Sequence, residues 1–120
     1  MRLPSVPISI GELLDKITIL EIKASFVKNE YVLKELEKLN EIKESIEQVD
    51  SYYLEQLRII NRKLWDIEDS LRKLEKEKKF DNEFIELARN VYKYNDERAK
   101  IKREINEITD SELREIKIYD

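Results

Sequence analysis

The stretch ISIGELLDKITILEIKASFV, residues 8–27, decides the fold because it combines a helix start with a sustained helical repeat. Ser9 is followed three residues later by Glu12, which is the spacing of a capping box at a helix N-terminus. Apolar residues then recur at alternating steps of about three and four, the period of one helix face. They are Ile10, Leu13, Ile17, Leu20, Ala24 and Val27.

A second apolar strip lies well round the same predicted helix and consists of Ile19, Ile22 and Phe26. A helix with two apolar sides is expected to be sandwiched between partners. Few residues remain in this chain to cover both sides. We therefore expect a homodimer or a higher symmetric oligomer.

Three further helices follow in the sequence. Asn29 is a plausible N-cap for a second helix that runs to about Asp50, although the break before it is weak and the first two helices could form one rod. This second helix is rich in Glu and Lys and is expected to be the most exposed. A third helix follows Asp50 and closes in the mixed-charge run 75–79. Asp81 is the predicted N-cap of the fourth, which continues through Ile108.

Thr109-Asp110-Ser111-Glu112 forms a second capping box, so a short terminal helix is predicted to end near Lys117. No strand pattern is present. The sequence thus predicts an all-α fold: an antiparallel bundle of about four main helices plus a short C-terminal helix. Residues 1–120 are expected to form a single helical domain, with residues 1–8 as an extended N-terminal segment.

Composition excludes many function classes. The 120 residues include one Gly, no Cys and no His, and 42% of them are charged. A Gly-rich phosphate loop, a thiolate site and an imidazole base are therefore excluded. Catalysis would depend on carboxylates, Lys, Arg or Tyr with a hard cation such as Mg²⁺.

The net charge of −4 is the wrong sign for a protein dedicated to nucleic acid. No run of about 18 uncharged apolar residues predicts a membrane span. The N-terminus is too short and too interrupted by proline to be a signal peptide. We expect a cytoplasmic protein with no nucleic-acid or membrane partner.

Polar residues fall inside the apolar stripes, where a simple bundle would have Leu or Ile. Burying such groups is costly unless they are paired and hydrogen-bonded. On a helical wheel, Glu21 and Glu68 are expected to oppose Arg98 and Lys102. The candidate site residues are Glu21, Asn61, Glu68, Asp69, Asn95, Arg98, Lys102 and Asn106.

Two interpretations of these residues stay open. In the first, they form a structural network that fixes helix register. In the second, Arg98 and Lys102 bind a small anion or nucleotide. A form of the second is a Mg²⁺-dependent phosphohydrolase, since Glu12-x-x-Asp15 and Glu83-x-x-Glu86 resemble the carboxylate pairs of all-α nucleoside triphosphate pyrophosphohydrolases. Their order and separation differ from that family's pattern.

Three stretches together resemble a known family: residues 8–23, LWDIED at 64–69, and FIELARNVYKYNDERAKIKREIN at 84–106. The chain resembles a family of small helical proteins of bacteria and their viruses that has no known function. The likeness includes the terminal segment Ser111-Glu112-Leu113. It implies one small helical domain and no particular chemistry.

The favoured hypothesis is a non-enzymatic interaction or assembly module that needs no cofactor and acts through a protein partner. The alternative is a small-anion or nucleotide-binding protein, with a phosphohydrolase as one form of it, and Mg²⁺ is expected only under that alternative.

Overall fold

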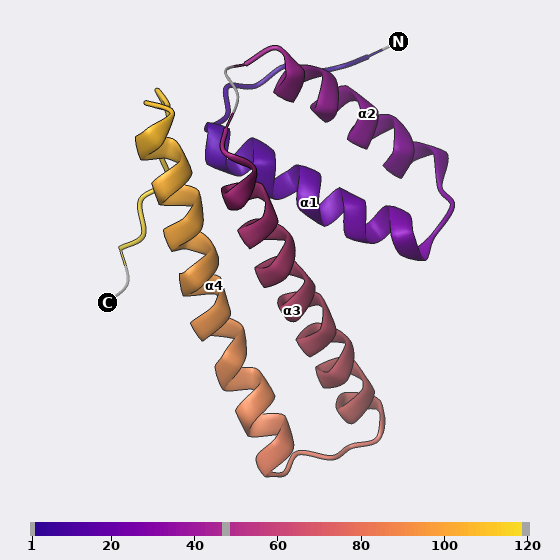
Figure 1. Ribbon diagram of the computed structural model, residues 1–120. Coiled ribbons are helices and arrows are strands. Elements are labelled where there is room, and N and C mark those ends of the chain that lie inside the picture. The colour runs from indigo at the N-terminus through magenta and orange to yellow at the C-terminus, as the bar shows by residue number, and fades with distance from the viewer. Residues whose placement is uncertain (1, 47–48, 119–120) are drawn as a thin grey trace.

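The computed structural model describes residues 2–46 and 49–118. Within these ranges the chain is helical, with no strand, as predicted (Figure 1). The helices are α1 (Ile10–Phe26), α2 (Glu30–Glu44), α3 (Ser51–Lys76) and α4 (Asn82–Ile108).

Helix α1 lies at the centre of the fold and contacts each of the other three helices. Its N-cap is Ser9, whose Oγ accepts a hydrogen bond from the Glu12 N–H at 3.1 Å. In a capping box the Glu12 carboxylate would also accept from the Ser9 N–H. Here that carboxylate binds Lys102 instead. The central core cluster consists of Leu13, Leu14, Ile17, Leu57, Ile60 and Ile105.

Most of both apolar sides of α1 is covered by the chain itself, since α2, α3 and α4 all contact α1, although Phe26 is 51% exposed. A second copy is therefore not required to bury α1. The need to bury α1 is therefore no argument for an oligomer, and the oligomer stays a prediction.

Helices α1 and α2 are separate elements, joined through an extended backbone at Val27 and capped at Asn29, whose Oδ1 accepts from the N–H groups of Tyr31 and Val32. As predicted, α2 is the most exposed helix, and none of its residues is buried. The predicted end near Asp50 is wrong, because α2 ends at Glu44. Asp50 is instead the N-cap of α3.

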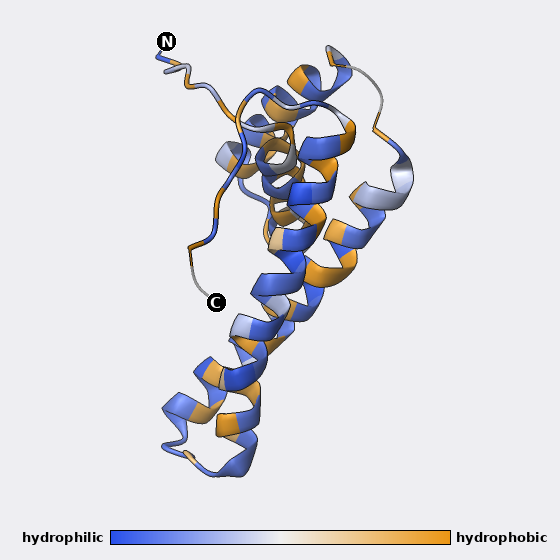
Figure 2. Ribbon diagram, turned by 90° about the vertical axis from the view of Figure 1, so that its left-hand side faces the viewer, coloured by the Kyte–Doolittle hydropathy of each residue, from blue (hydrophilic) through white to orange (hydrophobic). Residues whose placement is uncertain are grey.

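Helices α3 and α4 form an antiparallel hairpin (Figure 1). Asp81 is the N-cap of α4, as predicted, and accepts a hydrogen bond from the Glu83 N–H. The far end of this hairpin extends beyond α1 and α2 in both views (Figures 1 and 2). At that end the two helices cover only one another.

The predicted terminal helix is wrong: residues 111–118 are not helical. The Thr109 hydroxyl, expected to cap a new helix, donates to the Ile105 carbonyl of α4 at 2.6 Å. Asp110 then adopts a left-handed φ of 50°, and the Ser111 N–H donates to the Asn106 carbonyl at 2.8 Å. These bonds close the C-terminus of α4 and turn the chain away from the helix axis.

Candidate functional site

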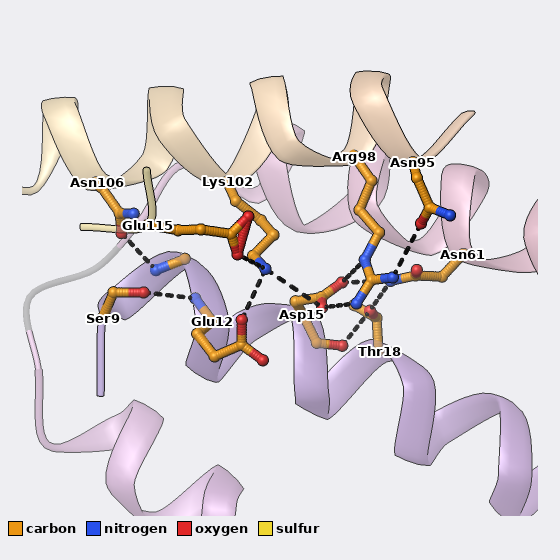
Figure 3. Close-up of polar contacts among 11 residues, drawn as sticks. Ser9, Glu12, Asp15, Thr18, Asn61, Asn95, Arg98, Lys102, Asn106 and Glu115 are labelled. Atoms are coloured by element: carbon orange, nitrogen blue, oxygen red, sulfur yellow. Dashed lines mark hydrogen bonds and ion pairs between the residues drawn. The ribbon is translucent and has the colours of Figure 1, made fainter. Parts of the chain in front are cut away.

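The centre of the polar site is the carboxylate of Asp15, which is completely buried between α1 and α4 (Figure 3). Arg98 binds it with two nitrogens. Nε lies 2.9 Å from Oδ1, and Nη2 donates to Oδ2. A bidentate guanidinium–carboxylate pair is among the strongest polar contacts in proteins and fixes the orientation of both groups. The remaining Arg98 terminal nitrogen donates to Asn95 Oδ1 at 3.3 Å.

Helix α3 contributes Asn61 to the same site. Its Nδ2 donates to Asp15 Oδ1 and to Thr18 Oγ1, each at 2.8 Å. The Thr18 hydroxyl is itself oriented, since it donates to the Asp15 backbone carbonyl at 2.8 Å. The buried carboxylate thus has partners from α3 and α4, which compensates for its loss of hydration.

Lys102 lies one helical turn beyond Arg98 on α4 and is buried. Its Nζ is 2.6 Å from Glu12 Oε2 and 3.0 Å from Glu115 Oε2, with Asp15 Oδ2 at 3.9 Å. Glu115 belongs to the non-helical C-terminal segment, which therefore reaches back to α4. We call Glu12, Asp15, Thr18, Asn61, Asn95, Arg98, Lys102 and Glu115 the Asp15 cluster.

The two cations of the Asp15 cluster are held in their charged forms. Burial alone would lower the pKa of Lys102, but its hydrogen bonds to Glu12 and Glu115 and the charge of Asp15 raise that pKa above its ordinary value. The pKa of Arg98 is likewise raised, because the contacts with Asp15 outweigh the effect of burial.

The N-terminus of α1 is bound by residues from the far end of the chain. Asn106 Oδ1 accepts from the Gly11 N–H at 2.7 Å, and Ser111 Oγ accepts from the Ile10 N–H at 3.1 Å. The first N–H groups of a helix have no partner within it, so Ser9, Asn106 and Ser111 together satisfy three of them. We call these three residues the α1 cap.

The approach of α1 to α4 at the α1 cap requires glycine. A Cβ atom at Gly11 would lie 2.6 Å from the Lys102 carbonyl oxygen and 2.9 Å from Asn106 Oδ1. Only the absence of a side chain permits this contact. Gly11 is the one glycine of the chain.

The predicted site residues separate into several places. Asn61, Asn95, Arg98 and Lys102 join the Asp15 cluster, whereas Asn106 belongs to the α1 cap. Glu21 was expected to oppose Arg98 and Lys102, but it pairs with Arg58 of α3, 2.9 Å away. It lies six residues after Asp15, about 240° further round the helix, and so projects elsewhere.

Glu68 and Asp69 are exposed on α3 and form no bond to Arg98 or Lys102 in the described part of the chain. They line a hollow of about 510 Å³ between α1, α3 and α4, which Asn61, Asn95 and Arg98 also line. Trp65 also lines this hollow. We call this space the Trp65 hollow. Five of the eight predicted residues therefore line one space, although only three of those five belong to the Asp15 cluster.

The partners of Arg98 and Lys102 were assigned wrongly from the sequence. The carboxylates that bind them belong to Glu12, Asp15 and Glu115. Asp15 could have been found from the sequence. It lies four residues before Ile19 and therefore continues the second apolar strip of α1, so its carboxylate is expected on a buried side of that helix. Glu115 could not be found in this way, since it lies in a segment without helical periodicity.

Chemically, the Asp15 cluster joins α1, α3, α4 and the C-terminal segment. Within residues 2–46 and 49–118, no group of three or more carboxylates has an arrangement that could hold a metal ion. None of the described helices is long and apolar enough to cross a membrane.

No curated protein and no solved structure matches this chain. A protein-family model does match, and it covers residues 4–120, nearly the whole sequence. This confirms the family resemblance that the sequence motifs indicated. The chain belongs to the family of unknown function DUF6165.

Proposed function

We propose that this protein is a non-enzymatic interaction or assembly module whose buried polar residues set the helix register. One observation carries the proposal: the cations that an anionic ligand would need are already bound by carboxylates of the same chain. Arg98 is bound by Asp15, and Lys102 lies within 3.0 Å of both Glu12 and Glu115. Fully satisfied polar networks of this kind rigidify a fold and specify its packing.

Charge balance also disfavours an anion at this place. Three carboxylates against two cations leave the Asp15 cluster with one net negative charge. A neighbouring hollow of about 460 Å³ is lined by Lys102 and Lys117, but Lys117 is itself paired with Asp96 at 3.1 Å. A phosphate there would have to displace a carboxylate from each lysine.

The exposed end of the α3–α4 hairpin is the surface we propose for association. Phe80 and Ile85 are each at least half exposed there, at 53% and 50%, and Tyr92, seven residues after Ile85 on α4, is 56% exposed. Two helices that cover only one another leave their outer sides free to pack against a partner helix. We propose a second copy as that partner, giving a homodimer or a higher symmetric oligomer.

The test is light scattering across a range of protein concentrations. We expect species that are multiples of the 14.5 kDa chain at micromolar concentration. Ile85→Glu should weaken association roughly tenfold by burying a charge in the interface. Ser70→Glu is the matched control because it adds the same charge at another exposed position of the hairpin. A 14.5 kDa species at every concentration contradicts the assembly role.

A thermal-melt panel separates this proposal from the anion-binding alternative. Nucleotides, sugar phosphates and carboxylates are each added with and without Mg²⁺. A ligand at about 100 times its Kd stabilises the folded state by roughly 2.7 kcal/mol and would raise the melting temperature by several degrees. No shift is expected. A shift that requires both nucleotide and Mg²⁺ would support a phosphohydrolase instead.

A further inference from the structure

The C-terminal segment returns along α4 and is attached to it by two ion pairs. The chain leaves the end of α4 and runs back beside that helix (Figure 1). Glu115 Oε2 lies 3.0 Å from Lys102 Nζ, and Lys117 Nζ lies 3.1 Å from Asp96 Oδ1. The contact moves back along α4 as the segment advances, so the segment is antiparallel to the helix.

Residues 115–118, which we call the returning segment, have their charged side toward α4 and their apolar side toward solvent. Ile116 and Ile118 are 78% and 86% exposed. Of the four side chains in the two ion pairs, only that of Lys102 is buried. Ion pairs with exposed partners contribute little to stability. The returning segment is thus held by charge without burying its isoleucines, and its release from α4 costs little.

The Asp15 cluster does not need Glu115 to neutralise Lys102. Lys102 Nζ also lies 2.6 Å from Glu12 Oε2, and Arg98 is paired with Asp15. Without Glu115, two carboxylates stand against two cations, and neither cation lacks a partner. Release of the returning segment therefore leaves the contacts between α1 and α4 in place and opens one carboxylate position on Lys102.

The α4 surface under the returning segment is complementary to it in charge. This surface presents an ammonium at Lys102 and a carboxylate at Asp96, about 9 Å apart along the helix axis. Hollows of about 460 and 520 Å³ lie beside the returning segment, and Ala99 lines both. An extended chain that binds here needs a carboxylate followed two residues later by an ammonium. Every copy of this protein carries that pattern.

We propose that two copies of the chain exchange their returning segments, each of which binds the Lys102–Asp96 surface of the other copy. The ion pairs are the same in the closed and exchanged forms, so exchange sacrifices neither of them. It also places Ile116 and Ile118 between the two copies, where a partner surface covers them. This inference rests on the proposed assembly role, since its partner is a second copy, but it uses a different surface from the hairpin end.

The chain before the returning segment allows this exchange. Residues 112–114 are exposed, and their hydrogen bonds within the described part of the chain that involve side chains are local, to Asp110 and Ser111. Ser111 remains in the α1 cap. The six residues from Ser111 to Lys117 span about 20 Å when extended, whereas the axes of packed helices are about 8–10 Å apart. The returning segment can therefore reach a second α4 that lies alongside.

A charge-swapped pair of variants tests the exchange. Asp96→Lys and Lys117→Glu each place two like charges at this ion pair within one copy. When the two variants are mixed, exchange restores opposite charges at both ion pairs of the mixed dimer. One variant is isotope-labelled, so that native mass spectrometry distinguishes mixed dimers from dimers of one variant. We expect mixed dimers about tenfold above the random proportion, since two exposed ion pairs are gained.

The control pair is Lys38→Glu and Glu41→Lys, which swaps the charges of an ion pair within α2. Exchange of the returning segment does not affect this pair, so mixed dimers should form in the random proportion. An equal excess of mixed dimers in the control means general charge attraction and overturns the proposal.

The failure of the exchange and the failure of the assembly role give different results. Dimers in the random proportion from Asp96→Lys and Lys117→Glu mean that copies associate without exchange, which overturns this inference alone. A 14.5 kDa species at every concentration of the wild-type chain overturns both.

Introduced cysteines provide a second readout that does not depend on charge. The chain has no cysteine of its own. Copies with Asp96→Cys are mixed with copies with Lys117→Cys in oxidised glutathione. Exchange should form the disulfide-linked mixed dimer at least about tenfold faster than a mixture of Lys38→Cys and Lys117→Cys, because it raises the effective concentration of the two thiols. Equal rates in the two mixtures overturn the proposal.

Discussion

Replacing Gly11 by alanine tests the approach of α1 to α4. The new Cβ would lie 2.6 Å from the Lys102 carbonyl oxygen, well inside the 3.0 Å that real Cβ atoms respect. Because that oxygen belongs to the α4 backbone, it cannot rotate away as a side chain would. The two helices must separate or α1 must shift along α4.

Two effects of opposite sign determine the free energy of unfolding. Alanine in place of glycine stabilises a helix by up to about 1 kcal/mol. Overpacking costs about 1–3 kcal/mol, and weakening the 2.7 Å bond from the Gly11 N–H to Asn106 costs about 1 kcal/mol more. The net expectation is destabilisation by about 2 kcal/mol, which lowers the melting temperature by roughly 8 °C in a domain of this size.

The assay is urea unfolding monitored by circular dichroism, with Lys16→Ala as control. Lys16 lies on the same helix and is exposed, so its replacement should change stability by less than about 0.5 kcal/mol. If Gly11→Ala instead stabilises the protein by about 1 kcal/mol, the higher helix propensity of alanine outweighs any steric cost of its Cβ. The close contact between α1 and α4 would then be refuted.

Three further predictions concern the ion pairs. Asp15→Asn leaves Arg98 without its buried carboxylate partner and should cost about 3 kcal/mol in urea unfolding; a cost below about 1 kcal/mol would contradict the buried pair. Arg58→Ala removes a pair with Glu21 whose side chains are 42% and 34% exposed, so a cost under about 1 kcal/mol is expected by the same method. For Lys102, the raised pKa means that its stabilisation is complete below the unfolded-state pKa of about 10.4 and is lost as pH rises through the folded-state value. The difference in unfolding free energy between wild type and Lys102→Met should therefore be constant from neutral pH to about 10 and fall above it, and a difference that falls between pH 7 and 9 would contradict this assignment.

Local signals in the sequence predicted the helices well. Ser9, Asn29 and Asp81 were identified as N-caps, and each accepts a hydrogen bond from the helix that it begins. Such signals are readable because a cap and its N–H partner lie within three residues of one another. The terminal helix was predicted by the same logic and is wrong, because the Ser111 hydroxyl bonds to Ile10 of α1 and to the Leu113 carbonyl.

The candidate site was predicted only in part. Arg98 and Lys102 were correctly placed among apolar neighbours by their helical phase. Their partners were wrong, because helical phase gives the direction of a side chain and not the residue it will meet. Glu21 falls in the apolar stripe by its helical phase, yet it pairs with Arg58 of α3 at 2.9 Å and not with Arg98 or Lys102.

The sequence by itself determined the all-α class, the position of most helix starts and the presence of buried charge, because each depends on spacing within one helix. Only the tertiary structure decided that Asp15 is the central carboxylate, that Glu115 reaches Lys102, and that Gly11 must lack a side chain. Those facts depend on pairs about 13 to 91 residues apart. Which pairs meet is set by how the helices pack, and that packing minimises unpaired buried polar groups over the whole chain at once.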